Sequence, residues 1–506
     1  MKTVKREASV TVPLCMALLI LAALVFALVE GARYYGLKAD AEDGTKLAAE
    51  SLFAGYQPFL LEEYGMFFLD GNFGGDKFRI EGAEDEINAF LYENFIAGKK
   101  DAGIDLYHMQ QAEAKVTEYM LATDAAGRVF EMQAAKTMKN RLKREAAEKI
   151  MEKIRSVTEQ ADSTESPKKA ITGAEEALKE IKAAGEKKAE NADTKSAKTE
   201  SAEAEPAETS GITAQASENP LEIIKKLKKE GVLALVLPAG KTVSEKTWDV
   251  TNCLLKRNCR KGTWEIGGKP GWYERILMQE LLKQMAGNAA APKERGSLSY
   301  GTEYIICGKG SDRENLKKTA NKLLLLREIA NYLYLQTDEE KKAEALTVAS
   351  AVGGALASPE LITVIRQGIL AAWAYAESLC DVKALLAGGK IPLIKNAASW
   401  HTQLSNLSET VKADYKGESS GLSYENYLDV LLYERTVKQI AYRGMDLMEY
   451  QLKEKADYKS CRMDHMITGI RITAEYHADT LFFGIFGEDT VGGYRFTGKE
   501  EYIYGP

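Results

Sequence analysis

One pattern in the sequence could support nucleophilic catalysis, a G-x-S-x-G at residues 417–421. In hydrolases a serine in this pattern lies between a buried strand and a helix, because the strained turn between them exposes the hydroxyl group. The preceding residues, VKADYK, are polar and do not predict such a strand. We therefore interpret residues 417–421 as a Ser/Gly loop that leads into a helix starting at Tyr424.

Three groups of residues that contain acidic side chains could in principle perform acid/base catalysis. They are the pairs Glu62-Glu63 and Glu500-Glu501, and the series Trp373, Glu377 and Asp381 at four-residue spacing. Residues four apart share one face of a helix, and acids in that arrangement usually form a solvated face or a cap. No pattern indicates that these acids converge on a cleft, so the sequence predicts no enzyme and no catalytic residue.

Metal and cofactor signatures are also missing from the sequence. It contains no G-x-x-x-x-G-K-[ST], no H-E-x-x-H and no C-x-x-C. No two histidines lie within five residues of each other, and we predict neither a metal site nor a cofactor; the histidines are His108, His401, His465 and His477. Cys253 and Cys259 could pair outside the cell, although an odd number of external cysteines favours unpaired or buried thiols.

Composition favours a packed protein with more than one core. The chain has 506 residues, of which 45% are apolar and 28% charged, and these values are typical of globular proteins. Its 67 basic and 74 acidic side chains give a net charge of −7. This mild acidity argues against a nucleic-acid partner, because proteins that bind nucleic acids normally carry an excess of basic residues.

Residues 10–29 form the one long uncharged segment. Twenty residues at about 1.5 Å each span a hydrocarbon core of about 30 Å, so we predict a single transmembrane helix. Basic side chains in residues 1–9 predict a cytoplasmic N-terminus, with the rest of the chain extracytoplasmic at the cell membrane. A cleaved signal peptide is the alternative, but its apolar region is usually shorter. The apolar stretch 343–386 carries Arg366, Glu377 and Asp381, which favours soluble core helices.

The remaining sequence predicts an α+β protein, because helical and strand-like patterns occur in separate blocks. Residues 30–56 should extend the membrane helix as a stem. Residues 57–182 should form an α+β part with strands in 104–122 and an amphipathic helix in 138–154. Residues 183–220 are a low-complexity insertion, disordered or loosely helical, at the tip of a helical hairpin. Residues 221–506 should be mainly helical, with helices at 272–285, 313–335, 339–354, 361–386 and 424–453, and C-terminal strands near 470–476, 494–496 and 502–503.

Several stretches resemble known sequences. The run ASVTVPLCMALLILAALVFALVEGARYYGLKADAEDGTKLAAES resembles the N-terminus of TadE-like pseudopilins, small membrane-anchored proteins of tight-adherence (Flp-type) pili. LFAGYQPFLLEEYGMFFLD, EYIICGKGSDRENL, WAYAESLCDVKALLAGGKIPLIK and GLSYENYLDVLL resemble an uncharacterised family of large single-span bacterial proteins. The sequence departs from type IV prepilins: a cut after Ala8 would put Pro13 where they carry glutamate, and the first acid after the apolar run is Glu30.

The resemblance implies a membrane-anchored, pseudopilin-like surface protein that serves a tight-adherence pilus or related secretion system. Pilus or secretion-system subunits are then the expected partners besides the membrane. A membrane-tethered cell-envelope enzyme and a surface binding module remain the alternatives. For Glu30, at the outer end of the span, the sequence leaves three alternatives: a solvated charge, a pair with Arg33 of a neighbour, or a pair with a cationic partner subunit.

Overall fold

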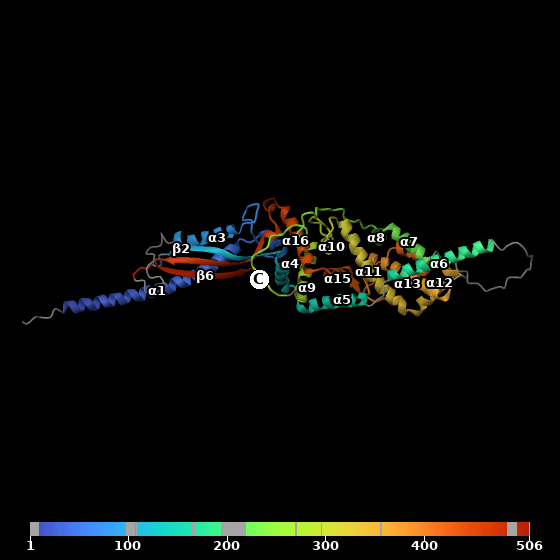
Figure 1. Cartoon of the computed structure of the whole chain (residues 1–506), viewed down its shortest axis with the longest axis horizontal. Coiled ribbons are helices and arrows are strands. Elements are labelled where there is room, and N and C mark those ends of the chain that lie inside the picture. The colour runs from blue at the N-terminus through green and yellow to red at the C-terminus, as the bar shows by residue number, and fades with distance from the viewer. Residues whose placement is uncertain are drawn as a thin grey trace, which may run out of the picture. The chain divides into compact units, whose positions relative to one another are not determined.

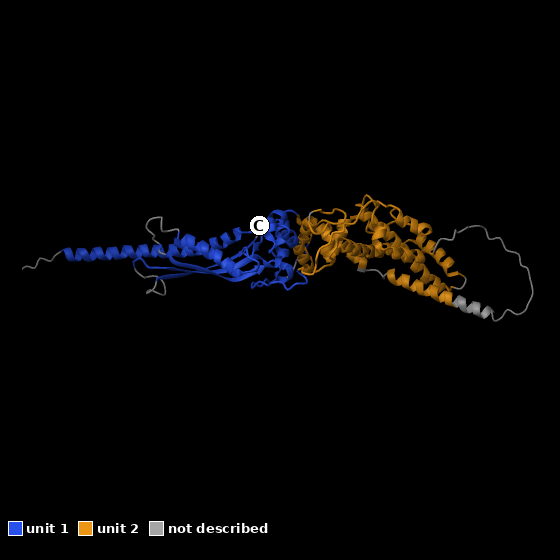
Figure 2. Ribbon diagram, turned by 90° about the horizontal axis from the view of Figure 1, so that it is seen from above, with its two compact units in different colours: residues 1–141, 254–275, 448–506 blue, residues 142–253, 276–447 orange. Residues whose placement is uncertain are grey.

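The computed structural model describes residues 10–97, 107, 109–162, 167–193, 219–268, 271–294, 296–354, 357–482 and 493–504. The chain forms two compact units, coloured separately in Figure 2. Unit 1 comprises residues 1–141, 254–275 and 448–506, and unit 2 comprises residues 142–253 and 276–447. Each unit therefore draws on distant parts of the sequence, in contrast to the consecutive blocks expected from sequence at 57–182 and 221–506.

The first element of unit 1 is α1, one unbroken helix from Thr11 to Ala54. At about 1.5 Å per residue its 44 residues extend about 66 Å, so the expectation of one continuous helix through residues 10–29 and most of 30–56 is confirmed. Its C-terminal part packs into the core of unit 1 through positions that recur every three or four residues, such as Leu37, Ala41, Ala48 and Leu52.

The sheet of unit 1 has β5 (Met466–Ala478) at its centre. β2 (Met109–Leu121) pairs with one edge of β5, and β6 (Tyr494–Ile503) and the short β1 (Leu69–Asp70) pair with the other. All pairings are antiparallel. β2 and β5 fall where the sequence predicts strands, within 104–122 and over 470–476. The separate strands expected near 494–496 and 502–503 are instead one continuous strand, β6, and the short β1 was not predicted. β5 follows its alternation, with Ile470, Ile472, Ala474 and Tyr476 buried in the core that includes α1.

Small residues allow α1 to approach this sheet closely. A Cβ atom on Gly498 of β6 would lie 2.0 Å from Thr45 Oγ1 on α1, and a Cβ atom on Gly44 would lie 2.3 Å from the Phe95 ring. Helix α3 (Ile80–Tyr92) packs beside α1 and against β2 (Figure 1). One face of the sheet is thus covered by two helices, whereas the opposite face carries exposed ion pairs of Arg471 with Glu118 and Glu501.

A tight turn joins β2 to α4 (Asp124–Lys139). Ala125 and Ala126 adopt positive φ angles of 48° and 57°, which non-glycine residues rarely do. The Asp124 carboxylate holds this turn, because it accepts hydrogen bonds from the backbone N–H groups of Leu121 (2.6 Å) and Gly262 (2.9 Å). It therefore also ties the segment around Trp264 to the end of β2. The remaining short elements of unit 1 are α2 (Pro58–Tyr64), a π-helical turn (Glu93–Ala97) and 3-10 turns at Ala456–Tyr458 and Met463–His465.

Unit 2 is built around α13 (Pro359–Leu386). From Gly368 to Leu386 every residue of this helix is buried, because α6, α11 and α12 pack around it. The stretch is therefore a soluble core helix, as expected from its charged residues; among the described residues only α1 is long and apolar enough to cross a membrane. The other elements are α5 (Arg144–Asp162), α6 (Pro167–Asp193), α7 (Pro220–Glu230), α8 (Val232–Val236), α10 (Gly301–Cys307), α11 (Asp312–Thr337), α12 (Glu339–Gly353), β3 (Lys390–Ile391), a 3-10 turn (Leu404–Asn406), α14 (Leu407–Lys412), β4 (Leu422–Ser423) and α15 (Tyr424–Tyr433). α9 (Trp272–Ala286) and α16 (Val437–Lys453) contribute residues to both units.

Two helices expected from periodicity are each divided in the structure. The amphipathic pattern at 138–154 spans the end of α4 and the start of α5, which are separate helices. The pattern at 424–453 is broken between α15 and α16, where Thr436 and Gln439 cap each other's backbone N–H groups and begin a new helix. This T-x-x-Q signature is visible in the sequence, whereas hydrophobic spacing alone did not reveal the break.

The low-complexity insertion, expected to be disordered or loosely helical, is helical where it begins. Helix α6 continues to Asp193, so the first residues of the segment 183–220 are helical, and Asn219 caps α7 at its other end. The prediction of disorder for residues 194–218 lies outside the described residues. Lys225 of α7 lies 3.8 Å from Glu175 of α6, which agrees with a helical hairpin whose stems lead back to one unit.

Candidate functional site

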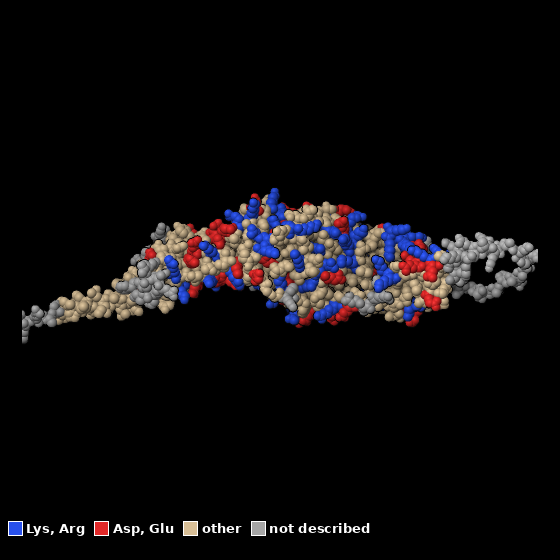
Figure 3. Space-filling model, in the orientation of Figure 1, with Lys and Arg blue, Asp and Glu red and all other residues tan. Residues whose placement is uncertain are grey.

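The N-terminal half of α1 is exposed and apolar. No charged side chain occurs between Val10 and Val29, and Leu18, Leu19 and Ile20 expose 65–71% of their surface. Figure 3 shows this part of the helix without Lys, Arg, Asp or Glu, whereas side chains of both charge signs are scattered over the rest of the described surface in this view. Because such a large contiguous apolar surface is costly in water, this half of α1 is the clearest interaction surface in the chain.

Glu30 marks the point where α1 becomes buried. Its carboxylate accepts a hydrogen bond from Arg33 Nη1 at 3.0 Å, and Arg33 also donates to the carbonyl oxygen of Tyr107. Backbone N–H groups of Leu481 and Phe482 lie 3.4 and 3.3 Å from the same carboxylate. Glu30 is fully buried, so the expectation of a solvated charge is wrong. The partners that its carboxylate has here belong to its own chain, and not to a neighbour or a partner subunit.

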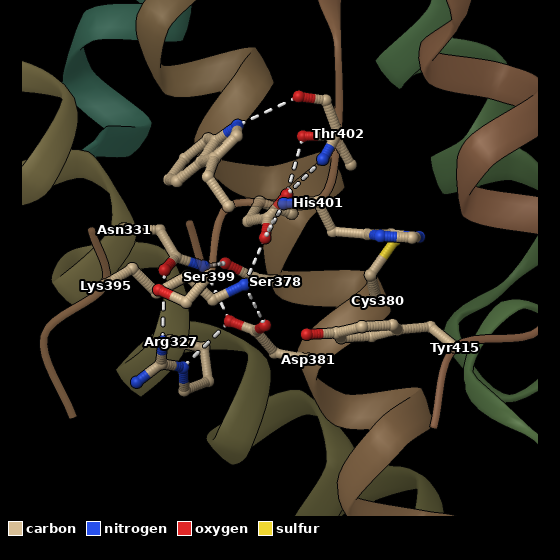
Figure 4. Close-up of polar contacts among 12 residues, drawn as sticks. Arg327, Asn331, Ser378, Cys380, Asp381, Lys395, Ser399, His401, Thr402 and Tyr415 are labelled. Carbon is tan, nitrogen blue, oxygen red and sulfur yellow. Dashed lines mark hydrogen bonds and ion pairs between the residues drawn. The ribbon is translucent and has the colours of Figure 1, made fainter. Parts of the chain in front are cut away.

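Inside unit 2, the side chains of Trp373, Glu377 and Asp381, which lie at four-residue spacing on α13, contact residues from other elements. Figure 4 shows Asp381 with Arg327 and Lys395 around it. Lys395 Nζ lies 2.6 Å from Asp381 Oδ1 and also pairs with Glu377. Arg327 of α11 donates from Nε to Asp381 Oδ2 at 3.0 Å. We call Arg327, Glu377, Asp381 and Lys395 the ionic network; each of these side chains exposes at most 1% of its surface.

Polar groups around the ionic network satisfy its remaining hydrogen-bonding capacity. Glu377 accepts hydrogen bonds from the backbone N–H groups of His401 (3.0 Å) and Thr402 (2.8 Å) and from the Thr402 hydroxyl (2.7 Å). Asn331 donates to Asp381 at 2.8 Å. Trp373 Nε1 donates to Thr402 Oγ1 at 2.9 Å, which places the indole beside the charges. A buried charge needs this degree of pairing, because it has lost its water.

The two cations keep the Asp381 carboxylate ionised. Burial alone would raise the pKa of Asp381, but Lys395 and Arg327 hold it below its ordinary value. Burial alone would likewise lower the pKa of Lys395, but Asp381 and Glu377 raise it. With two positive and two negative groups the network is neutral overall. Because its charges are buried and paired, the ionic network is suited to holding α11, α13 and the Lys395 segment together. None of its four charged groups is open to a substrate.

The other candidate residues are dispersed. Ser419 and Ser420 are exposed in a loop that follows helix α14 and precedes α15, so the expected loop into a helix at Tyr424 is confirmed. His401 stacks on Tyr415 with ring centroids 4.2 Å apart, and His465 contacts Asn72 Oδ1 at 2.7 Å. His108 lies outside the described residues. Among those described, no three His, Cys, Asp or Glu side chains form a group that could hold a metal ion.

The two acidic pairs singled out in the sequence lie on different elements, and the two candidate cysteines are not bonded to each other. Glu62 and Glu63 are exposed on α2, and Glu500 and Glu501 lie on β6, where Glu501 pairs with Arg471. No disulfide joins Cys253 and Cys259, both of which lie within the described part of the chain; Cys259 Sγ donates to the Leu254 carbonyl oxygen at 3.3 Å.

Sequence reasoning missed Arg327, Asn331 and Lys395. A signal was present: Arg327 and Asn331 are four residues apart in a helical pattern, and Lys395 ends an otherwise apolar run, IPLIK. An isolated basic residue among apolar ones points to a buried ion pair, but its partner cannot be identified without the fold.

The fold and these sites define an α+β protein with one apolar N-terminal helix long enough to cross a membrane. The chain belongs to a family described as a family of unknown function, DUF5702, which it matches over residues 211–478, slightly more than half of its length. The match includes every residue of the ionic network and excludes α1. No curated protein and no solved structure matches the chain.

Proposed function

We propose that this protein is a membrane-anchored, extracytoplasmic, pseudopilin-like component that serves the structure or assembly of a tight-adherence pilus or a related secretion system. The observation that carries the proposal is the division of α1 at Glu30. Before this residue the helix is exposed and uncharged, and after it the helix is part of the core of unit 1. A pilin stem is divided in the same way: one half contacts the membrane or neighbouring subunits, and the other half packs against its own domain.

The direct coupling of α1 to the sheet supports an assembly role. Because one unbroken helix serves both lipid and core, a contact made in the bilayer is transmitted to unit 1 without a flexible linker. Helices in lipid associate through side-chain packing and polar contacts rather than through exclusion from water, so the sequence of the span, and not only its hydrophobicity, would determine partners.

A span exchange tests the pilus link. Residues 10–25 are replaced by an unrelated apolar span of equal length, and the rest of the chain is retained. We expect correct membrane insertion but loss of co-purification with pilus or secretion-system subunits and loss of pilus-linked adhesion. A chain whose residues 10–25 are shuffled, with the composition kept, is the matched variant for sequence dependence. Full retention of both properties with the foreign span would refute the proposal and favour a tethered enzyme or surface binding module.

A labelling experiment tests orientation. Ser420 is exposed in a loop, so Ser420→Cys should react with a membrane-impermeant maleimide on intact cells if the residues after the span are extracytoplasmic. The unsubstituted chain gives the background from its own cysteines, and a cytoplasmic protein reports cell integrity. Labelling of Ser420→Cys only after lysis would contradict the orientation.

A further inference from the structure

Unit 1 contains an apolar cavity of about 260 Å³ on the sheet face opposite α1. α4, the segment at Trp264 and the ends of β2, β5 and β6 enclose it. Its apolar walls are Met120, Val129, Met132, Trp264, Ile266 and Ile503. Charged side chains also line it: Lys136, Glu265, Arg471 and Glu501. Since one water occupies about 30 Å³ of liquid, the space could accommodate a bicyclic aromatic group. Methionine and tryptophan side chains also make favourable contacts with aromatic rings.

A second, polar hollow of about 170 Å³ adjoins the first. The two share Gln133, Lys136 and Tyr504, and the second is also lined by Asn140 and Arg141. Lys136 and Arg141 are exposed, and neither makes an ion pair within the described part of the chain. A largely apolar compartment therefore lies beside one that Lys136 and Arg141 make cationic, and Gln133 lines both. The carboxylates of Glu265 and Glu501 lie in the first compartment, so a ligand carboxylate fits the second.

Gln133 presents a buried hydrogen-bond acceptor to both hollows. The side chain is 8% exposed, and its Nε2 group donates to the carbonyl oxygen of Phe67, which fixes the orientation of the amide. Its Oε1 atom is buried and accepts no hydrogen bond from the protein. An unsatisfied buried acceptor is costly, so a group with an N–H or O–H donor in either hollow would be stabilised there.

We propose that these two hollows form a binding site for an aromatic carboxylate that carries an N–H or O–H donor. The aromatic body occupies the apolar cavity, the donor bonds to Gln133 Oε1, and the carboxylate lies near Lys136 and Arg141. An indole or phenol bearing an acidic side chain has this chemistry. It can come from a free small molecule or from the C-terminal tryptophan or tyrosine of a polypeptide.

Three probes separate the parts of this recognition. Indole-3-acetate has all three features, its N-methylated form lacks the donor, and indole-3-acetamide lacks the charge. Binding is measured by isothermal titration calorimetry on the full chain in lipid nanodiscs, with empty nanodiscs as the blank. We expect saturable binding of indole-3-acetate, about tenfold weaker binding without the donor, and about three- to fivefold weaker binding without the charge.

Variants locate the binding. Ile503→Trp should abolish it by filling the mouth of the cavity from a residue that is 40% exposed, so the fold should tolerate the change. Lys136→Met combined with Arg141→Met should weaken indole-3-acetate to the level of the amide and remove the salt dependence. Lys139→Met is the matched control, because Lys139 is exposed on the same helix but lines neither hollow. Circular dichroism and melting temperature verify the fold of each variant.

Peptides distinguish the two sources. Acetyl-Gly-Gly-Trp with a free carboxylate and the same peptide with a C-terminal amide are titrated in parallel. Binding of the free-acid peptide supports a polypeptide C-terminus, and binding of indole-3-acetate alone supports a free small molecule. The proposal is overturned if neither binds, if all three probes bind equally, or if Ile503→Trp binds like the unsubstituted chain; water alone would then satisfy Gln133.

Discussion

Lys395→Met removes the cation that joins the two acids of the ionic network. In the intact protein Lys395 contacts both Glu377 and Asp381, and all three side chains are fully buried. After the substitution Asp381 keeps Arg327 at 3.0 Å, but Glu377 keeps only neutral donors from His401 and Thr402. The network then holds one positive and two negative groups, and no water is available to solvate the excess charge.

The cost of this change follows from burial. Removing one partner of a buried ion pair typically costs about 3 to 5 kcal/mol, because the remaining charge is left uncompensated. Replacing Glu377 as well, in Lys395→Met/Glu377→Gln, restores one positive and one negative group. The double variant should therefore be more stable than Lys395→Met alone by about 1 to 3 kcal/mol, which is a strongly non-additive result.

Urea unfolding of the full chain in detergent micelles measures these free energies. Tryptophan fluorescence is a suitable signal, because Trp373 donates to Thr402 and Trp400 lies 5.7 Å from Trp373 between ring centroids. Hydrogen exchange of the α13 backbone assigns the loss to unit 2. Lys416→Met is the matched control, because Lys416 is an exposed lysine in a nearby loop, and it should change stability by less than about 0.5 kcal/mol.

Two results would refute the reasoning. A loss below about 1 kcal/mol for Lys395→Met would mean that water or a rearranged side chain solvates the acids, so the site is not closed. A double variant less stable than Lys395→Met would mean that Glu377 matters for its hydrogen bonds to the 401–402 backbone rather than for its charge.

Further predictions concern both units and the insertion. Burial raises the pKa of Glu303 to about 7, so its contribution to stability is greatest below about pH 4.5 and is lost as pH rises to about 7. Glu303→Gln should remove about 2 kcal/mol of that pH dependence, measured as the difference between unfolding free energies at pH 5 and pH 7.5. Gly498→Val, which clashes with Thr45, should cost unit 1 about 1 to 3 kcal/mol in urea unfolding, whereas Gly267→Ala, in open space, should cost little. Deleting residues 194–218, whose only branched or aromatic apolar residue is Ile212, should leave the melting temperature within a few degrees.

Local patterns in the sequence predicted the elements well. The uncharged segment and the helix formers that follow it gave a continuous α1, and four-residue spacing gave α9, α11, α12 and α13 nearly to their ends. These features depend on neighbours in the sequence, so propensity and periodicity suffice. The spacing of Trp373, Glu377 and Asp381 also identified one face of α13 correctly, although the role suggested for it was solvation.

Long-range arrangement could not be read in the same way. Lys395 and Arg327 meet Asp381 across a helix, a strand and a loop, and no local pattern encodes that meeting. The division into units was missed for a similar reason: residues 254–275 return to unit 1 through hydrogen bonds of Asp124 and Tyr119, which are long-range pairings. The cavity at Gln133 depends on an absence of packing, and sequence patterns report only residues that are present.

The junction at Glu30 determines how the span exchange must be built. Phe26 stacks on Phe482 with ring centroids 4.6 Å apart. The Glu30 carboxylate accepts hydrogen bonds from the backbone N–H groups of Leu481 and Phe482, in the same segment. An exchange that included Phe26 or Glu30 would disturb unit 1 as well as the lipid contacts, and lost co-purification would then have two explanations. Residues 10–25 are almost entirely exposed, so exchanging them changes only what α1 presents to the bilayer. The Glu30→Gln variant supplies the complementary case: it weakens the bond to Arg33 while the span stays intact. If assembly depends on the span, the Glu30→Gln variant should still co-purify with its partner subunits but should be less stable. The span exchange should leave stability unchanged but lose co-purification.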